Sequence, residues 1–260
     1  MKIWRLISGY VRHNFMAGMA YRGAFFLQIF GMMINNLMLL FFWNMMFLSF
    51  PTLNGWELQD IIVLYSIVAV GFGFSVVIFG NASRLASLIT SGELDYYLAL
   101  PADPLVHLLV SRMSLSGWGD FFFGLLLYLF VLPSAWRNLP LFLLLSLLAG
   151  LISTAFAVLT GSLAFWLGES EQLAAQLRMA LLNFSLYPVD IFSGGVRLLL
   201  YTIIPAAFVG SVPAKLLTDF DIWWLAGLIL VTALMGGLAS WVFRLGLRRY
   251  ESGNLVTVRG

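Results

Sequence analysis

The dominant pattern in this sequence is a series of long apolar runs separated by short polar connections. A hydrocarbon core about 30 Å thick requires roughly 20 apolar residues of helix to cross it. The runs that approach or exceed this length are residues 22–50, 59–80, 105–132, 139–167, 173–191 and 222–243. Six apolar runs of this length are not expected in a soluble domain. The pattern therefore predicts an all-α polytopic membrane protein with six transmembrane helices.

The first 20 residues have a different period. Ile3, Leu6, Ile7 and Tyr10 recur at helical spacing with basic residues between them, which predicts an amphipathic helix in the headgroup plane. The alternative is a basic tail before the first span. The apolar run that follows is too long for the roughly 7–15-residue core of a signal peptide, so we expect it to be retained.

Residues 188–217 allow two interpretations. The segment is apolar, but Pro188, Pro205, Pro213 and the glycines near residue 194 interrupt any continuous helix. It is either a seventh span or a re-entrant segment between the fifth and sixth spans. Irregular backbone at membrane depth is tolerated only where protein or water surrounds it.

The distribution of basic residues favours the second interpretation. With a cytoplasmic N-terminus and six spans, most of the 14 Lys and Arg residues fall on the cytoplasmic side, in agreement with the positive-inside rule. These are Lys2, Arg5, Arg12, Arg22, Arg84, Arg112, Arg178, Arg244, Arg248, Arg249 and Arg259. Only Arg137, Arg197 and Lys215 fall outside, whereas a seventh span would divide the charges evenly. We therefore expect cytoplasmic N and C termini.

Composition agrees with lipid as the main solvent. Hydrophobic residues make up 61% of the chain and charged residues 10%, against about 25% charged residues in soluble domains. The basic residues at membrane edges are topology signals, so we expect no nucleic-acid partner. The chain has no cysteine, and neither His13 nor His107 is followed by a metal-ligand residue three or four positions later, which argues against a metal site.

Five positions in or beside the apolar runs carry polar groups that require partners. Asn35 and Asn36 lie in the middle of the first span and should face other helices. Asp120 lies within the third run, either lining a pathway or pairing with a nearby arginine, Arg112 or Arg178. Asp190 and Arg197 flank the break after the fifth run, where they form a gate or a local ion pair.

The connection at residues 81–104 is unusually long and polar. It contains a short helix candidate at about residues 84–89 and a turn at Gly92. Glu93 and Asp95 follow the turn, and Pro101 and Pro104 are expected to break any helix before the third span. Such a short, stiff and acidic element suits contact with a basic soluble partner, although an ordinary solvated loop would have the same composition.

No ATP-binding loop of the Walker A type is present. The only lysines are Lys2 and Lys215, and neither has the glycines and hydroxyl residue of that motif around it. We therefore expect no cofactor on this chain.

Three stretches carry a resemblance to a known family. They are residues 91–98 with Pro101, the segment containing Tyr187-Pro188, Ile204-Pro205 and Val212-Pro213, and residues 247–254. Together with the topology, they resemble ABC-2 type permeases, the membrane subunits of ATP-binding-cassette transporters in bacterial plasma membranes. The resemblance implies a single transmembrane domain over residues 1–260 that works, most often in export, with P-loop ATPase subunits and a second permease, identical or homologous. ATP and Mg would be bound by the ATPase.

The resemblance also implies roles for particular segments. Residues 1–20 would be an elbow helix, residues 81–104 would hold the helix that couples to the ATPase, and residues 188–217 would form a re-entrant extracellular hairpin. The coupling candidates are Arg84, Gly92, Glu93, Leu94, Asp95, Tyr96, Tyr97 and Pro101, and the pathway or gate candidates are Asn35, Asn36, Asp120, Asp190 and Arg197. Two other classes stay open: a polytopic membrane enzyme and a secondary transporter that needs no ATPase.

Overall fold

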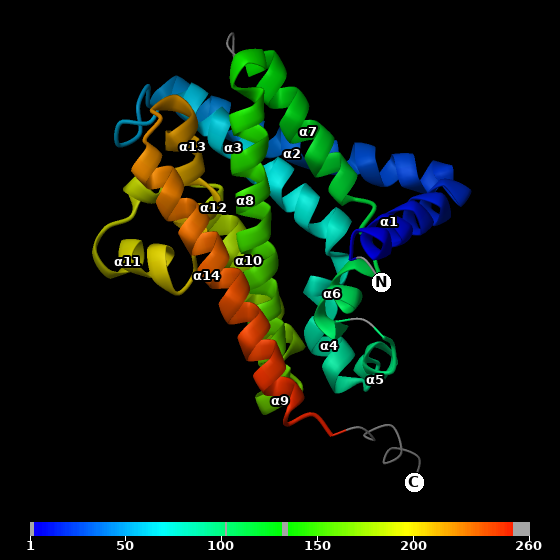
Figure 1. Cartoon of the computed structure of the whole chain (residues 1–260). Coiled ribbons are helices and arrows are strands. Elements are labelled where there is room, and N and C mark those ends of the chain that lie inside the picture. Colours follow the sequence, from blue (N-terminus) through cyan, green and yellow to red (C-terminus); the bar gives the residue numbers. More distant parts are fainter. Residues whose placement is uncertain (1–2, 102, 132–134, 252–260) are drawn as a thin grey trace.

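A computed structural model of the chain describes residues 3–101, 103–131 and 135–251, and within them the fold is helical with no strand (Figure 1). The long helices are α1 (Ile3–Ala20), α2 (Arg22–Ser49), α3 (Leu58–Ile78), α7 (Gly117–Val131), α8 (Ala135–Ser162), α10 (Glu171–Ser185) and α14 (Ile222–Leu247). The short helices are η1 (Gly80–Arg84), α4 (Leu85–Thr90), α5 (Leu94–Leu98), α6 (Pro104–Val110), α9 (Ala164–Leu167), η2 (Val189–Ile191), α11 (Gly194–Thr202), α12 (Ala206–Val209) and α13 (Ser211–Thr218). Lys2, Arg259 and residues 252–254 of the C-terminal stretch 247–254 lie outside the described residues.

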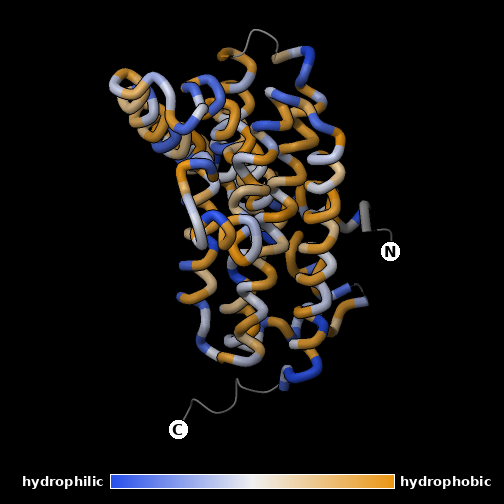
Figure 2. The backbone as a smooth tube through the Cα atoms, turned by 90° about the vertical axis from the view of Figure 1, so that its left-hand side faces the viewer, coloured by the Kyte–Doolittle hydropathy of each residue, from blue (hydrophilic) through white to orange (hydrophobic). Residues whose placement is uncertain are grey.

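Four helical segments in the described part are long and apolar enough to cross a membrane: Arg22–Ser49, Leu58–Ile78, Ala135–Leu167 and Ile222–Leu247. They agree with the first, second, fourth and sixth predicted spans. Hydrophobic residues run along these helices, and many hydrophilic ones lie in the connections (Figure 2). The chain is thus an all-α membrane protein. Because α7 and α10 have only 15 residues each, the count of six spans stays a prediction.

The prediction for the third span was wrong at its start. Residues 104–110 form the separate helix α6, and the apolar helix α7 begins only at Gly117. Pro104 does not break a helix but begins one, at the position where proline needs no amide hydrogen bond. The Asp103 side chain caps α6 by accepting a hydrogen bond from the Val106 amide (3.1 Å). The fifth predicted span is also shorter than expected, since α10 ends at Ser185.

Helix α3 is the centre of the bundle. In the most apolar stretch of 18 residues in α3, 78% of the residues are buried. The helix packs between α7 and α8. Glycines allow this close packing. A Cβ atom on Gly71 would lie 2.7 Å from the Ser146 carbonyl oxygen, and one on Gly73 would lie 2.6 Å from the Gly117 carbonyl oxygen. The absence of a side chain at these two positions therefore permits the close approach of α3 to its neighbours.

The two flanking helices have the opposite character. Only 17% of the corresponding window of α2 and 11% of that of α14 is buried within the chain. Their exposed side chains are large and apolar, for example Phe30 and Leu48 on α2 and Leu230 and Leu234 on α14. In a membrane protein such faces contact lipid or another subunit, because exposing them to water would be unfavourable.

The segment 188–217 turns back on itself. Helix α11 and the α12–α13 pair are bent by 62° relative to one another. The two ends of the segment meet, because the Lys215 ammonium lies 2.6 Å from the Asp190 carboxylate. Both lie beside the turn between α2 and α3, since the Asn54 amide donates a hydrogen bond to the Asp190 carbonyl oxygen (2.9 Å). The segment therefore begins and ends at the same end of the bundle.

Candidate functional site

The connection 81–104 folds into four short helices at one end of the bundle, where α9 and the end of α14 also lie (Figure 1). The predicted short helix at 84–89 is present as α4, but its side chains are buried against the bundle: Leu85, Ala86, Leu88 and Ile89 are at most 6% exposed. Gly92 forms the predicted turn in the left-handed region, with φ of 78°. The turn separates buried α4 from the more exposed helix α5.

Helix α5 divides the coupling candidates into two groups. Leu94 is fully buried, in a cluster with Leu88 and Leu108, so it anchors the helix and is not available to a partner. Glu93, Tyr96 and Pro101 are exposed, and the Tyr96 side chain is 64% exposed although it is aromatic. Arg84 is half-buried and donates a long hydrogen bond of 3.5 Å to Asn81. The surface available to a partner is thus the Glu93–Tyr96 face of α5.

A polar network holds α5 against α6 and α1. The Tyr97 hydroxyl lies 3.0 Å from the Ser111 hydroxyl and accepts from the Asn81 amide. The Tyr97 ring meets the edge of the His107 ring, and His107 Nε2 is hydrogen-bonded to the Tyr10 hydroxyl of α1. Burial lowers the pKa of His107, which favours its neutral form. The network therefore links α1, α5 and α6 to one another through side-chain contacts.

Asp95 is engaged within the chain. The Tyr250 hydroxyl, just beyond α14, hydrogen-bonds to its carboxylate, and burial together with this carboxylate raises the pKa of Tyr250 to about 12. A second link to α14 is the ion pair between Arg244 and Asp103 (3.2 Å). Helix α5 and its flanks are therefore tied to the last membrane helix as well as to α1.

Inside the bundle, Asp120 is part of a buried polar chain. Its Oδ1 accepts a hydrogen bond from the Asn36 amide (2.8 Å), and Asn36 Oδ1 accepts one from the Tyr65 hydroxyl (2.7 Å). Asp120 and Asn36 are only 4% and 5% exposed. The expected partners of Asp120 were wrong: within the described residues it forms no ion pair with Arg112 or Arg178. The chain joins α2, α3 and α7.

Asn35 does not share this environment. Its side chain is exposed, whereas that of Asn36 is buried, because neighbouring residues on a helix point about 100° apart. Asn36 thus faces other helices of this chain, whereas Asn35 does not. Its amide lies on the outer face of α2, near the middle of the helix.

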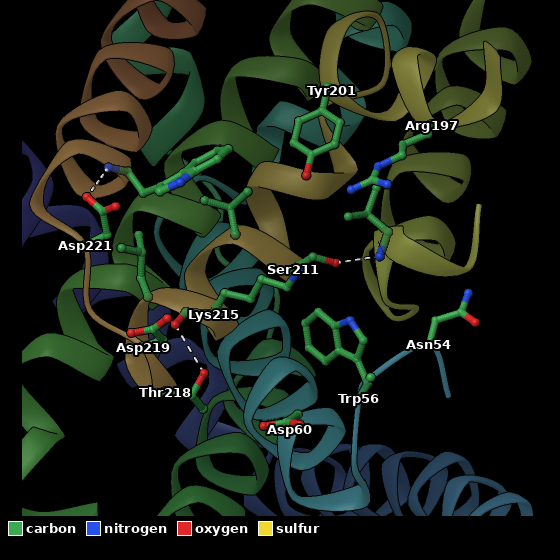
Figure 3. A pocket seen from close by; sticks show the side chains of 15 residues that line it. Asn54, Trp56, Asp60, Arg197, Tyr201, Ser211, Lys215, Thr218, Asp219 and Asp221 are labelled. Atoms are coloured by element: carbon green, nitrogen blue, oxygen red, sulfur yellow. Dashed lines mark hydrogen bonds between the residues drawn. The ribbon is translucent and has the colours of Figure 1, made fainter. Parts of the chain in front are cut away.

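At the opposite end of the bundle, Asp190 is the centre of a charged cluster. Its carboxylate pairs with Arg197 (2.7 Å) and Lys215 (2.6 Å) and accepts a hydrogen bond from the Trp56 indole (3.0 Å). The Lys215 ammonium also lies 5.3 Å from the centre of the Trp56 ring. The expected pairing of Asp190 with Arg197 is present. Figure 3 shows Trp56, Lys215, Ser211, Tyr201 and Arg197 around the adjoining cavity of about 570 Å³.

Asp190 gives the stability of this end a defined pH dependence. Burial raises the pKa of Asp190, but hydrogen bonds from Lys215 and Trp56 and the nearby positive charges lower it more, so the pKa lies below its usual range. The stabilisation is therefore complete above about pH 4, the usual carboxyl pKa, and is lost as the pH falls through the depressed pKa. We expect Asp190→Asn to lower the free energy of unfolding by about 1 kcal/mol at pH 7, since both cations are half-exposed.

Thermal unfolding of the detergent-solubilised chain at pH 7 and at pH 3.5 measures this effect. The difference between Asp190→Asn and the unmodified chain should shrink at the lower pH. Arg244→Gln is the matched control, because its pair with Asp103 is more exposed and should contribute less. A difference that is the same at both pH values would contradict the assignment.

The candidates thus occupy three separate places: the α5 face, the Asp120 chain and the Asp190 cluster. Asp120 lines one cavity, whereas Arg197 and Lys215, the partners of Asp190, line another, so the structure does not bring the pathway candidates into one site. Sequence reasoning missed Tyr65, Trp56 and Tyr10 as partners. Tyr65 carried a usable signal, since a hydroxyl within an apolar span needs an acceptor.

These features define a class of protein: a helical membrane protein in which a polar network links short helices at one end of the bundle. Among the described residues, no group could hold a metal ion. The family follows from sequence comparison. Residues 33–253 match the family described as ABC-2 family transporter protein, so the chain belongs to it and is a permease subunit of an ABC transporter. That family acts together with ATPase subunits. No functionally curated protein matches the chain.

Proposed function

We propose that this chain forms the translocation pathway of an ABC exporter in a bacterial plasma membrane, together with a second, identical or homologous permease. ATP and Mg are bound by separate P-loop ATPase subunits. The family match supports the role of membrane subunit, and the absence of a Walker A motif from the sequence assigns hydrolysis to another chain. The chain itself carries no catalytic residue in this proposal.

The α5 face is the docking site for the ATPase. The observation that carries this assignment is an exposed tyrosine and an exposed carboxylate on a helix whose other side is fully anchored. Exposed aromatic side chains are typical anchors in protein interfaces. Because Tyr97 and Asp95 connect α5 to α1, α6 and α14, a movement of the ATPase would be passed to these helices.

The orientation in the membrane follows from this docking site. The end with α4–α6 faces the cytoplasm, as do both termini, and α1 is the elbow helix at that surface. Arg84, Arg112 and Arg244 lie towards this end, in agreement with the positive-inside rule. The chain then crosses the membrane six times, with α7 and α10 as short spans. Residues 188–217 form the re-entrant hairpin, which the Asp190–Lys215 pair closes on the extracellular side.

Charge reversal on the α5 face tests the docking site. We expect Glu93→Lys combined with Tyr96→Ala to reduce recovery of the ATPase with the purified permease by about tenfold or more, because aromatic hot spots are worth about 2 kcal/mol or more. The fold of the permease should be retained, since both side chains are exposed. The measurement is co-purification of the co-expressed, untagged ATPase in mild detergent.

Two control variants make the result specific. Asp219→Lys combined with Trp223→Ala changes an exposed acid and an exposed aromatic residue at the other end of the bundle and should leave ATPase recovery unchanged. Asp95→Asn disturbs the contact with Tyr250 but keeps the α5 face. If the Glu93 and Tyr96 variant recovers as much ATPase as the unmodified chain, the docking site lies elsewhere. If no ATPase is recovered with any variant, transport without an ATPase becomes the better interpretation.

A further inference from the structure

A second cavity, of about 360 Å³, lies among α3, α7, α8 and α10, within the size range of small-molecule sites, roughly 300–1,000 Å³. Its walls change in polarity along its length. Ser83, Ser114 and Ser116 line it beside the end of α3 and the start of α7. Val68, Leu182 and Val209 line it deeper in the bundle. Val68 is ten residues before the end of α3, about 15 Å along the helix axis.

Arg178 provides the cavity with a positive charge that forms no ion pair within the described residues. Glu171, at the start of α10, is the acidic group that interacts with it electrostatically. The Arg178 side chain lines the wall formed by α10, between Ala175 and Leu182. Within the described residues, the structure records no hydrogen bond or ion pair for its guanidinium group. A guanidinium group has five donors that can bind an anionic oxygen group, and the Arg178 side chain is half-buried in the cavity wall. Arg178 is therefore the group in this cavity that most requires a ligand.

Asp120 lies on another wall, but its situation differs. One of its carboxylate oxygens already accepts a hydrogen bond from the buried Asn36 amide. The protein thus supplies a donor to Asp120 and supplies no acceptor to Arg178. This asymmetry favours a ligand with an anionic oxygen group over a cationic one, because arginine binds phosphate and carboxylate groups through paired hydrogen bonds.

We propose that the cavity binds an amphiphile with an anionic oxyacid headgroup, such as a phosphate, which Arg178 holds while the alkyl tail lies against Val68, Leu182 and Val209. At the polar end, the hydroxyl of the Ser114–Ser116 pair that accepts the hydrogen bond between them keeps its own hydrogen to donate to the same headgroup. The proposal rests on the proposed function, because it names the class of substrate that the permease transports. Arg178 lies seven residues after the start of α10, about 10 Å along the helix.

Binding of radiolabelled dodecyl phosphate to the purified full-length chain in a non-ionic detergent tests the proposal. We expect Arg178→Gln to weaken binding by at least about tenfold, the loss typical of a charge-assisted hydrogen bond. Arg112→Gln is the matched control: this arginine is exposed, does not line the cavity and should leave binding unchanged. Ala175→Phe fills the cavity and keeps the charge, so it provides an independent test should Arg178→Gln fail to fold.

Two competitors identify the ligand class. Dodecyltrimethylammonium should not displace the labelled probe, and inorganic phosphate should displace it only weakly, because it lacks the tail. Equal competition by inorganic phosphate would replace the amphiphile with a free anion and overturn the proposal. Tighter binding of the cationic amphiphile, abolished by Asp120→Asn, would overturn it as well, as would unchanged binding in both Arg178→Gln and Ala175→Phe. ATPase recovery with Arg178→Gln should stay normal, so failure of the docking site and failure of this cavity are separate results.

Discussion

Replacement of Gly73 by alanine is expected to separate α3 from α7 and to remove most of the folded protein. A Cβ atom at this position would lie 2.6 Å from the Gly117 carbonyl oxygen and 2.6 Å from the Phe121 amide nitrogen. Both are backbone atoms, so no change of rotamer relieves the contact and the helices must move apart. Overpacking in a core costs about 1–3 kcal/mol and more where the backbone must shift. We expect the upper end of this range.

The thermal unfolding midpoint and the monodisperse fraction in size-exclusion chromatography measure the effect. Gly236→Ala is the matched control, because it places the same methyl group in membrane helix α14, where nothing lies within 4 Å. Alanine also has the higher helix propensity, so this control should be neutral or slightly stabilising. Equal losses in the two variants would mean that α3 and α7 are not as close as the structure shows.

The agreement for the four long spans has a simple physical basis. Lipid and the interior of the bundle are both apolar, so most residues of these helices are apolar whichever of the two they face, and run length alone identifies the helices. The same fact explains the failure at residues 105–110. Leu105 and Leu108 are buried in the cluster beneath α4 and α5, not in a span. Hydropathy does not distinguish a lipid-facing leucine from one packed against protein.

The polar candidates were harder to place because their partners are distant in sequence. Asn36 and Asp120 are 84 residues apart, and Trp56 and Asp190 are 134 residues apart. Only Asp190 with Arg197, seven residues apart, was close enough for the sequence to suggest the pair. Which of two adjacent asparagines faces inward depends on the rotation of α2 about its axis, and a helix that is apolar on all sides gives no signal of that rotation.

Substitution of Asn36 by leucine is expected to be the most harmful single change among the polar positions. It removes the donor to Asp120 and the acceptor for the Tyr65 hydroxyl at once. Each buried group left without a partner costs about 1–3 kcal/mol, and more for a charged one, so we expect a total loss of about 3–5 kcal/mol. Asn35→Leu is the matched control: the same substitution one residue away, on the exposed face of α2, should change stability little in the isolated chain.

The companion change Asp120→Asn separates structure from function at this site. Its amide oxygen can still accept the hydrogen bond from Asn36, so folding and ATPase recovery should persist. Transport by the reconstituted complex then reports on the carboxylate itself. Retained transport would assign Asp120 to the structural chain with Asn36 and Tyr65. Lost transport with normal assembly would assign the Asp120 carboxylate to the translocation pathway. Asp120 lines the same cavity as Arg178, the residue proposed to bind the anionic headgroup. A loss of stability in Asp120→Asn as large as in Asn36→Leu would contradict the hydrogen-bond scheme, because only the leucine variant leaves both neighbours without partners.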